Sequence, residues 1–164
     1  MLNLLQKEQN RLDLHHEIFL EMLEGKLHLA PLENPHNILD LGTGTGIWAI
    51  DMADKHPMAS VVGTDLSPIQ PRWVPPNCRF EVDDMEKPST FPSDHFDFIH
   101  ARNLAQSISN WPQVAADMFR YASRRGAALY FQALISAGAH APADTSSWPS
   151  SRARCTPPRR MRQS

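Results

Sequence analysis

The chain has 164 residues, with 16 Lys and Arg against 18 Asp and Glu, and a formal net charge of −2 at pH 7. This is the length of one domain with a real core, but it is short for an enzyme that carries both a cofactor half and a substrate half. The near balance of charge excludes an overall field that would attract nucleic acid or an anionic membrane.

The two cysteines, Cys78 and Cys155, stand far apart in a chain without a recognisable secretory signal. Such usage indicates neither a disulfide framework nor a zinc site, and we expect no metal. The longest apolar runs fall well short of the roughly 20 residues that span a bilayer. We therefore expect a protein of the cytoplasm, the nucleus or both, without a membrane partner.

The first predicted element is a helix from Met1 to about Leu23, followed by Gly25 as a typical stop. Apolar residues recur in it at mostly helical spacings, with charges of both signs between them. These apolar residues are Leu5, Leu12, Ile18, Phe19, Met22 and Leu23. We interpret residues 1–26 as an amphipathic helix that caps the core, in preference to a helix that binds a membrane or a partner, because its polar face mixes both charge signs.

A strand, a glycine turn, a helix and a second strand follow in that order. Asn37–Leu41 is a short apolar run that ends on glycine, and residues 46–54 have helical periodicity. Residues 60–64 form a second apolar run that ends at Asp65. Prolines make residues 67–76 a loop, because each would break the interior of a helix.

Two further strands are predicted at residues 78–82 and 96–100, then a helix at 111–121 and a last strand at 127–133. Short apolar strands that alternate with crossovers indicate a parallel sheet with helices on its faces. The Ala, Pro, Ser and Arg composition of residues 137–164 predicts a disordered basic tail.

Glycines at positions 42, 44 and 46 directly follow the first strand. Glycine permits positive φ and lets backbone N–H groups approach a ligand without a Cβ in the way. The pattern alone is weak evidence, since a tight turn chosen for close helix–strand packing has the same signature. The turn is therefore a candidate ligand cradle.

Two acids around this turn discriminate between ligands. Asp40 precedes the glycines, and Asp65 ends the next strand 25 residues later, where it is placed to accept ribose hydroxyls. Dinucleotide-binding turns place the third glycine three residues after the second, whereas here the spacing is two. Asp40 would repel a pyrophosphate and attract the sulfonium and amino groups of S-adenosylmethionine. The spacing therefore favours the methyl donor.

A third acidic feature, Asp83-Asp-Met85, follows the strand at residues 78–82. A carboxylate and the next backbone N–H there can bind the amino edge and a ring nitrogen of adenine. A solvated turn is an equal interpretation of these residues taken alone. Together with the other two features, the adenine interpretation is the stronger.

Four segments together resemble the fungal LaeA-like methyltransferases: residues 11–16, 38–51, 63–71 and 96–100. The resemblance runs in order from about Gln6 to Tyr121. It implies a Rossmann-like class I methyltransferase fold, with S-adenosylmethionine as cofactor and a link to fungal secondary metabolism or its regulation. We therefore expect a three-layer α/β/α domain over residues 27–136, with a mainly parallel sheet in the order 3-2-1-4 and a candidate fifth strand.

The resemblance also implies roles for individual residues in holding the cofactor. They are Asp40, Gly42, Gly44 and Gly46 for the methionine moiety, Asp65 with the adjacent Leu66 on the ribose side, and Asp84 with Met85 for adenine.

No catalytic residue is assigned, because methyl transfer from a sulfonium is an in-line displacement that positioning and desolvation can drive. His100 and Arg102 lie at the carboxyl end of the fourth strand, where ligands of such sheets collect. We interpret them as a surface histidine and a solvated arginine. His16 is interpreted as a helix-surface or cap contact, and Trp48 and Trp111 as core and rim packing.

The resemblance stops after Tyr121, where the family continues with a Leu-Lys-Pro-Gly-Gly turn, a fifth strand and further elements. Residues 122–128 are Ala-Ser-Arg-Arg-Gly-Ala-Ala instead. A shifted reading frame is one interpretation, and a genuine basic tail that binds an acidic partner or nucleic acid is the other. We expect a fold that is incomplete at its C-terminus.

Three functions stay open at this point. The first is an S-adenosylmethionine-dependent methyltransferase with an unknown small-molecule or protein acceptor. The second is a catalytically inactive remnant, or a regulatory module that keeps the cofactor pocket. The third, and least favoured, is nucleic-acid binding through the arginines between residues 152 and 162. The sequence does not indicate an oligomeric state.

Overall fold

The computed structural model describes residues 2–88, 90–123 and 128–132. These residues belong to one compact unit, Met1–Leu134, and the predicted tail at 137–164 lies outside them. The helices and strands are, in chain order, α1 (Leu2–Met22), β1 (Asn37–Leu41), α2 (Ile47–Lys55), β2 (Ser60–Asp65), β3 (Cys78–Val82), β4 (Phe98–Arg102), α3 (Trp111–Tyr121) and β5 (Ala128–Gln132).

The described strands form one parallel sheet in the order β3-β2-β1-β4-β5. The expected order 3-2-1-4 and the fifth strand are thus confirmed. β1 lies at the centre, where Asp40 is in register with Gly63 of β2 and with His100 of β4. The carboxyl ends of all these strands therefore meet at one edge of the sheet.

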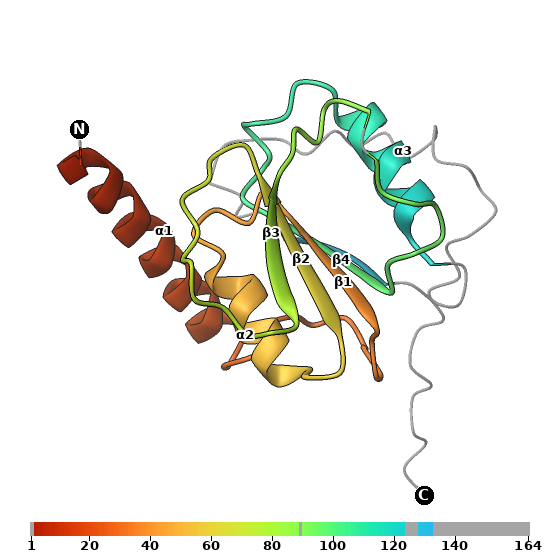
Figure 1. Ribbon diagram of the computed structural model, residues 1–164, viewed down its shortest axis with the longest axis horizontal. Coiled ribbons are helices and arrows are strands. Elements are labelled where there is room, and N and C mark those ends of the chain that lie inside the picture. Colours follow the sequence, from red (N-terminus) through yellow and green to blue (C-terminus); the bar gives the residue numbers. More distant parts are fainter. Residues whose placement is uncertain (1, 89, 124–127, 133–164) are drawn as a thin grey trace, which may run out of the picture. The chain divides into compact units, whose positions relative to one another are not determined.

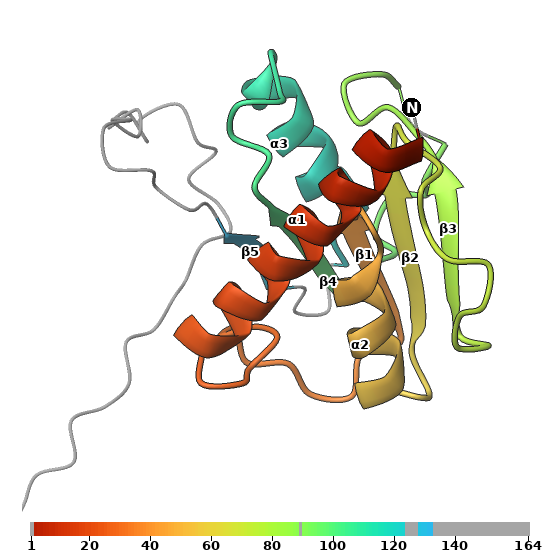
Figure 2. The ribbon, with the colours of Figure 1, turned by 90° about the vertical axis from the view of Figure 1, so that its left-hand side faces the viewer.

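Helices cover both faces of the sheet, as Figures 1 and 2 show, with α1 and α2 on one side and α3 on the other. Neighbouring residues of β1 point to opposite faces, as in any strand. Ile38 packs in a buried cluster with Trp48 of α2, and Leu39 in a second cluster with Val114 of α3. This confirms the three-layer architecture, and it places Asp40 on the face covered by α1 and α2.

Helix α3 begins at a well-satisfied N-terminus. The Asn110 side chain accepts a hydrogen bond from the backbone N–H of Gln113. The Glu86 carboxylate accepts from the backbone N–H groups of Ser109 and Asn110, both at 2.8 Å. These bonds satisfy donors that a helix terminus leaves free and place an anion at its positive end. They also fix the loop after β3 against the start of α3.

Helix α1 forms as predicted, and the backbone N–H of Gly25 donates to Leu20 where the chain leaves it. The apolar residues that were expected to pack on the core do so only in part. Phe19 is buried, but Leu5, Ile18 and Met22 are 52%, 45% and 62% exposed. The helix turns a more polar face inward because His16, which is fully buried, makes hydrogen bonds beneath it.

The fourth strand lies two residues later than predicted, at Phe98–Arg102 instead of 96–100. The cause is Asp97, whose carboxylate accepts hydrogen bonds from the backbone N–H groups of His36 and Asn37 at the entry to β1. Phe96 instead makes an isolated bridge with Ala122. The shift carries His100 and Arg102 inside the strand.

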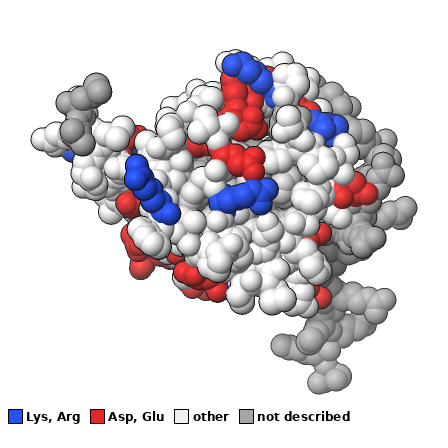
Figure 3. Space-filling view, in the orientation of Figure 1, with Lys and Arg blue, Asp and Glu red and all other residues white. Residues whose placement is uncertain are grey.

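Acidic and basic side chains are interspersed on the face shown in Figure 3, and most of that face is uncharged. Within the part of the chain that the structure describes, no helix is both long and apolar enough to cross a membrane.

Candidate functional site

The glycine turn connects β1 to α2, and its three glycines all have positive φ, 65° at Gly42, 59° at Gly44 and 83° at Gly46. Residues with a Cβ rarely adopt this region. The backbone N–H of Thr43 donates to the carbonyl of Thr64 at 2.9 Å, which fastens the turn to β2. The sequence from Gly42 to Gly46 therefore needs glycine for its backbone conformation.

Packing adds a second requirement at two of the glycines. A Cβ on Gly46 would meet the ring of Phe80 in β3, and a Cβ on Gly42 would meet the Leu104 side chain. At Gly44 the nearest atom would be Cδ1 of Leu12, at an ordinary 3.4 Å. Close packing thus explains part of the motif, and any preference for a ligand depends on the polar groups around it.

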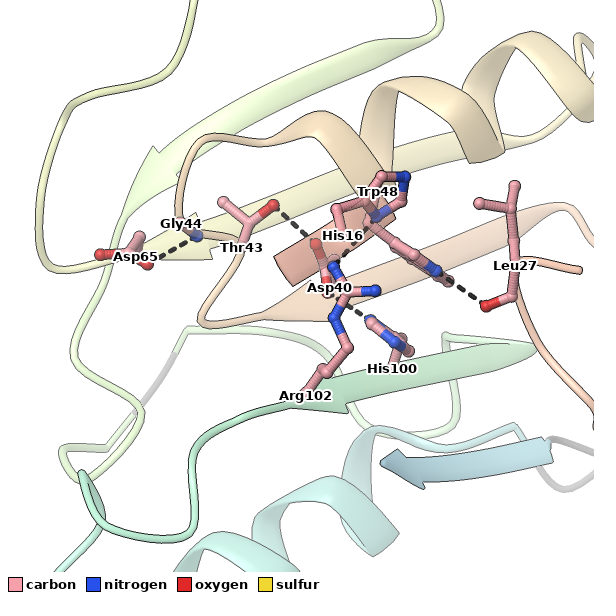
Figure 4. A network of polar contacts seen from close by, with 9 residues as sticks. All are labelled: His16, Leu27, Asp40, Thr43, Gly44, Trp48, Asp65, His100 and Arg102. Atoms are coloured by element: carbon pink, nitrogen blue, oxygen red, sulfur yellow. Dashed lines mark hydrogen bonds and ion pairs between the residues drawn. The ribbon is translucent and has the colours of Figure 1, made fainter. Parts of the chain in front are cut away.

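Asp40 lies beneath the turn, between the sheet and α2, and is only 3% exposed (Figure 4). One carboxylate oxygen accepts from the Thr43 hydroxyl at 2.6 Å, and the other accepts from Nδ1–H of His100 at 2.7 Å. A direct contact between Asp40 and a ligand would require these bonds to change. In this geometry the carboxylate orients Thr43 and acts on the site through its charge.

Asp65 reaches the glycine turn from the end of β2, which brings together two features predicted separately. Its carboxylate accepts from the backbone N–H of Gly44 at 2.8 Å and from that of Ser67 at 2.9 Å. The side chain is partly exposed, and each carboxylate oxygen can accept a further hydrogen bond. Asp65 therefore both fixes the turn and presents an anionic acceptor beside it.

Two segments that sequence reasoning did not assign to the site also contact the turn. The Gln70 side chain, in the loop after β2, donates to the carbonyl of Gly44 at 2.6 Å. Asp13 of α1 accepts from the Thr45 hydroxyl at 2.7 Å. Between α1, the start of α2 and this loop lies a cavity of about 340 Å³, lined by residues that include Gln9 and Ile69. Only proximity in the fold identifies these contacts.

The remaining predicted residues occupy the same edge of the sheet. Leu66, next to Asp65, is 67% exposed. Asp84 accepts from the backbone N–H of Glu86, and this bond and the Lys87 ammonium lower the pKa of its carboxyl. Met85 packs toward the α3 side of the sheet. The cofactor roles of all three stay predictions.

The interpretation of His100 as a surface residue is wrong, because it is 1% exposed. Its ring stacks on the indole of Trp48 with centroids 3.7 Å apart and planes 7° from parallel. The predicted core position of Trp48 is confirmed, and its indole N–H donates to the carbonyl of Leu27 at 3.0 Å. Burial lowers the pKa of His100, although Asp40 opposes the shift, so the imidazole is neutral at pH 7.

Arg102 and His16 form a second polar pair under α1, so neither is a freely solvated surface group. The guanidinium can only donate, and it donates to Nδ1 of His16 at 3.1 Å. Nε2–H of His16 therefore donates to Asp51 of α2 at 2.8 Å. Arg102 also lies 4.7 Å from the ring centroid of Phe19. These contacts tie α1 to β4 and α2.

Taken together, one carboxylate lies beneath the turn, and a second one beside it already accepts from the backbone N–H of Gly44. Such a site favours a ligand that is cationic near the turn and carries hydroxyl groups near Asp65. In the described part of the chain, no group of three or more His, Cys, Asp and Glu residues is arranged to hold a metal.

Comparison with protein families gives a match to the family described as a methyltransferase domain, over residues 14–160. The chain is 49% identical over 117 residues to methyltransferase pytC of Aspergillus terreus, and 45% identical over 119 residues to the secondary metabolism regulator LAE1 of Cochliobolus heterostrophus. It is 41% identical over 118 residues to the protein-methionine methyltransferase laeA of Emericella nidulans. These alignments cover about 70% of this chain but only 32–39% of the relatives.

Solved structures agree on the fold. A putative methyltransferase from Haloferax volcanii, in complex with the Trm112 methyltransferase activator, superposes with a TM-score of 0.63 at 19% identity, over 74% of this chain and 55% of that one. The plantazolicin methyltransferase BpumL, in complex with SAH, gives 0.54 at 20% identity over 60% and 39% of the two chains. With its parallel sheet, its glycine turn and its resemblance to LaeA-type proteins, the chain belongs to the methyltransferase domain family.

Proposed function

We propose that this chain binds S-adenosylmethionine at the glycine turn and acts as a methyltransferase domain. The observation that carries the proposal is the pair of carboxylates around the turn. Asp65 occupies the N–H of Gly44, and Asp40 lies buried beneath Thr43 with neutral hydrogen-bond donors on both of its oxygens. The negative charge of Asp40 thus remains available to a cation above the turn.

The same observation argues against a dinucleotide. A pyrophosphate needs free backbone N–H groups at the turn and a positive field. Here the Gly44 N–H is bonded to a carboxylate, and the acids beside it would repel a second anion. The sulfonium and ammonium groups of S-adenosylmethionine carry the complementary charge.

The cofactor would supply an electrophilic methyl group on its sulfonium, and the protein would supply position. The remaining lone pairs of Asp65 would accept from ribose hydroxyls, and the exposed apolar side chain of Leu66 would lose contact with water on binding. Asp84 and Met85 would serve the adenine end. An in-line displacement needs the acceptor aligned behind the methyl carbon, and exclusion of water assists it.

Isothermal titration calorimetry on the full chain, with S-adenosylmethionine and NAD as ligands, tests the proposal. We expect binding of the first and none of the second. Asp65→Asn keeps one acceptor oxygen but removes the charge, and should weaken binding about tenfold to a hundredfold. Asp54→Asn, an exposed position of α2, is the matched control and should change nothing.

A folded wild-type chain that gives no heat with S-adenosylmethionine, or that prefers NAD, would end the proposal. Transfer of a labelled methyl group to candidate acceptors then separates an enzyme from a binding module. Binding without transfer to any acceptor would favour the inactive, regulatory alternative.

The acceptor belongs to the same proposal. Relatives that carry the names secondary metabolism regulator and protein-methionine methyltransferase favour a role in fungal secondary metabolism or its regulation. Accordingly, both small secondary metabolites and proteins of a fungal extract belong among the acceptors to be tested.

A further inference from the structure

A continuous chain of buried contacts runs from β4 to the glycine turn. His100 donates to Asp40, and Asp40 accepts from Thr43 inside the turn (Figure 4). The three residues are 1%, 3% and 9% exposed. Proposed cofactor binding, by contrast, uses the outer side of the turn. This series of hydrogen bonds therefore lies behind the site and does not line it.

The imidazole of His100 has little freedom to leave this arrangement. Trp48 stacks on it at 3.7 Å, and the indole is itself held by its bond to the carbonyl of Leu27. Nδ1–H points at Asp40. The ring orientation and the donor role of Nδ1 are thus both fixed by neighbours, as in sites where an outer group orients an inner one.

Among the described residues, charged or titratable groups of three elements act on His100. Asp40 of β1 favours its protonation, while Arg102 of β4 and His16 of α1 oppose it, and Trp48 of α2 contributes no charge. Burial is the largest influence and keeps the ring neutral. Protonation at Nε2 would place a positive charge directly against Asp40.

We propose that His100 is a positioning residue for the glycine turn: it orients Asp40, Asp40 holds Thr43, and the net charge beneath the turn follows the protonation state of His100. The inference rests on the proposed function, because it makes affinity for a cationic cofactor depend on that charge. With a neutral His100, Asp40 accepts its hydrogen bonds from the described side chains of Thr43 and His100 as neutral donors, so its negative charge persists under the turn. A protonated His100 cancels it and weakens the attraction.

The first test measures S-adenosylmethionine affinity by calorimetry at about pH 7.5 and about pH 4.5; the lower value is chosen because burial moves the pKa of His100 below the ordinary histidine value. In the wild type we expect roughly a tenfold loss of affinity at the lower pH. His100→Asn keeps an N–H donor near the Nδ1 position but cannot be protonated. It should bind nearly as the wild type does at the higher pH and lose this pH dependence.

Two further variants separate positioning from general stability. His100→Leu removes the donor to Asp40 and should weaken binding at both pH values, so rescue by asparagine identifies the hydrogen bond as the important feature. His36→Asn is the matched surface control, since the His36 side chain is 82% exposed, and it should keep the wild-type pH dependence.

A second readout needs no cofactor. In the ¹⁵N-labelled chain, the amide signals of Gly42 and Gly44 should shift between about pH 7.5 and about pH 4.5, with the same midpoint as the His100 ring signal. Thr43→Val breaks the link to the turn and should abolish this shift while His100 still titrates. Thr43→Ser should restore it.

The outcomes are distinguishable. Equal pH dependence of binding in the wild type and in His100→Asn would overturn the inference and leave the proposed function standing. Glycine amide signals that do not follow His100 would also overturn it, even if His100→Asn failed to fold. Absence of any S-adenosylmethionine binding, with glycine signals that do follow His100, would instead remove the proposed function and keep the coupling.

Discussion

Replacing Gly46 by alanine separates the two reasons for glycine in the turn. Gly46 has φ 83°, and an added Cβ would lie 2.7 Å from Cε1 of Phe80 and closer still to Cζ. The left-handed conformation costs about 1–2 kcal/mol for a residue with a Cβ. Overpacking against a ring costs a further ~1–3 kcal/mol. We therefore expect Gly46→Ala to lower the free energy of unfolding by about 2–5 kcal/mol.

Gly25 provides the matched control. Its φ is 77°, close to that of Gly46, but an added Cβ would meet nothing within 4 Å. Gly25→Ala should therefore show the backbone cost alone, about 1–2 kcal/mol. Urea unfolding followed by circular dichroism gives both values, and the difference between them measures the contact with Phe80.

The Phe80→Leu background completes the test as a double-mutant cycle. Removing the aromatic ring should reduce the cost of Gly46→Ala to nearly that of Gly25→Ala. Equal costs at Gly46 and Gly25 in the parent protein, or no coupling to Phe80, would refute the view that packing demands glycine at this position.

Three further predictions concern groups outside the turn. Burial lowers the pKa of His28, so on acidification the unfolded chain takes up the proton at a higher pH than the folded chain does. Neutral His28 therefore leaves the free energy of unfolding undiminished above about pH 6.5, and this free energy falls as the pH drops below that value. In urea unfolding at several pH values, His28→Asn should reduce this slope but not abolish it, because burial also lowers the pKa of His56 and of His100; an unchanged slope would contradict the assignment. Glu86→Ala should cost about 1–2 kcal/mol, because it removes two hydrogen bonds to the start of α3; Glu86→Gln, which keeps an acceptor, should cost less, and equal losses would argue against the hydrogen bonds. Burial raises the pKa of the Cys78 thiol to about 11, so in a Cys155→Ser variant Cys78 should react with a thiol reagent at pH 8 only after unfolding; rapid labelling of the native protein would disprove this.

The strands were predictable because each is a short apolar run between turn residues. β1 and β3 have the predicted bounds, and the parallel order with β1 at the centre follows the expectation. β4 was misplaced by two residues because Asp97 looks like a polar strand position, whereas its carboxylate binds the backbone at the entry to β1. A side chain that bonds a segment 60 residues away leaves no local signal.

The site was predictable where residues adjoin a strand end and unpredictable where it depends on contacts across the fold. The association of Asp65 with the glycines followed from the parallel sheet. The burial of His100 did not, because it requires Trp48 to cover the ring and Asp40 to accept from it. Histidine is intermediate in its tendency to be buried, so the residue type alone does not show whether His100 lies in the core or on the surface.

The central position of β1 has a consequence for the chain while it is being synthesised. β2 follows β1 closely, but the partner of Asp40 in β4 is made 60 residues later. Until then one side of β1 offers unpaired N–H and C=O groups, the condition under which strands pair with other molecules. A charged side chain on such an edge disfavours that pairing. The carboxylate that shapes the turn in the folded protein therefore also makes the unfinished sheet a poor template for aggregation.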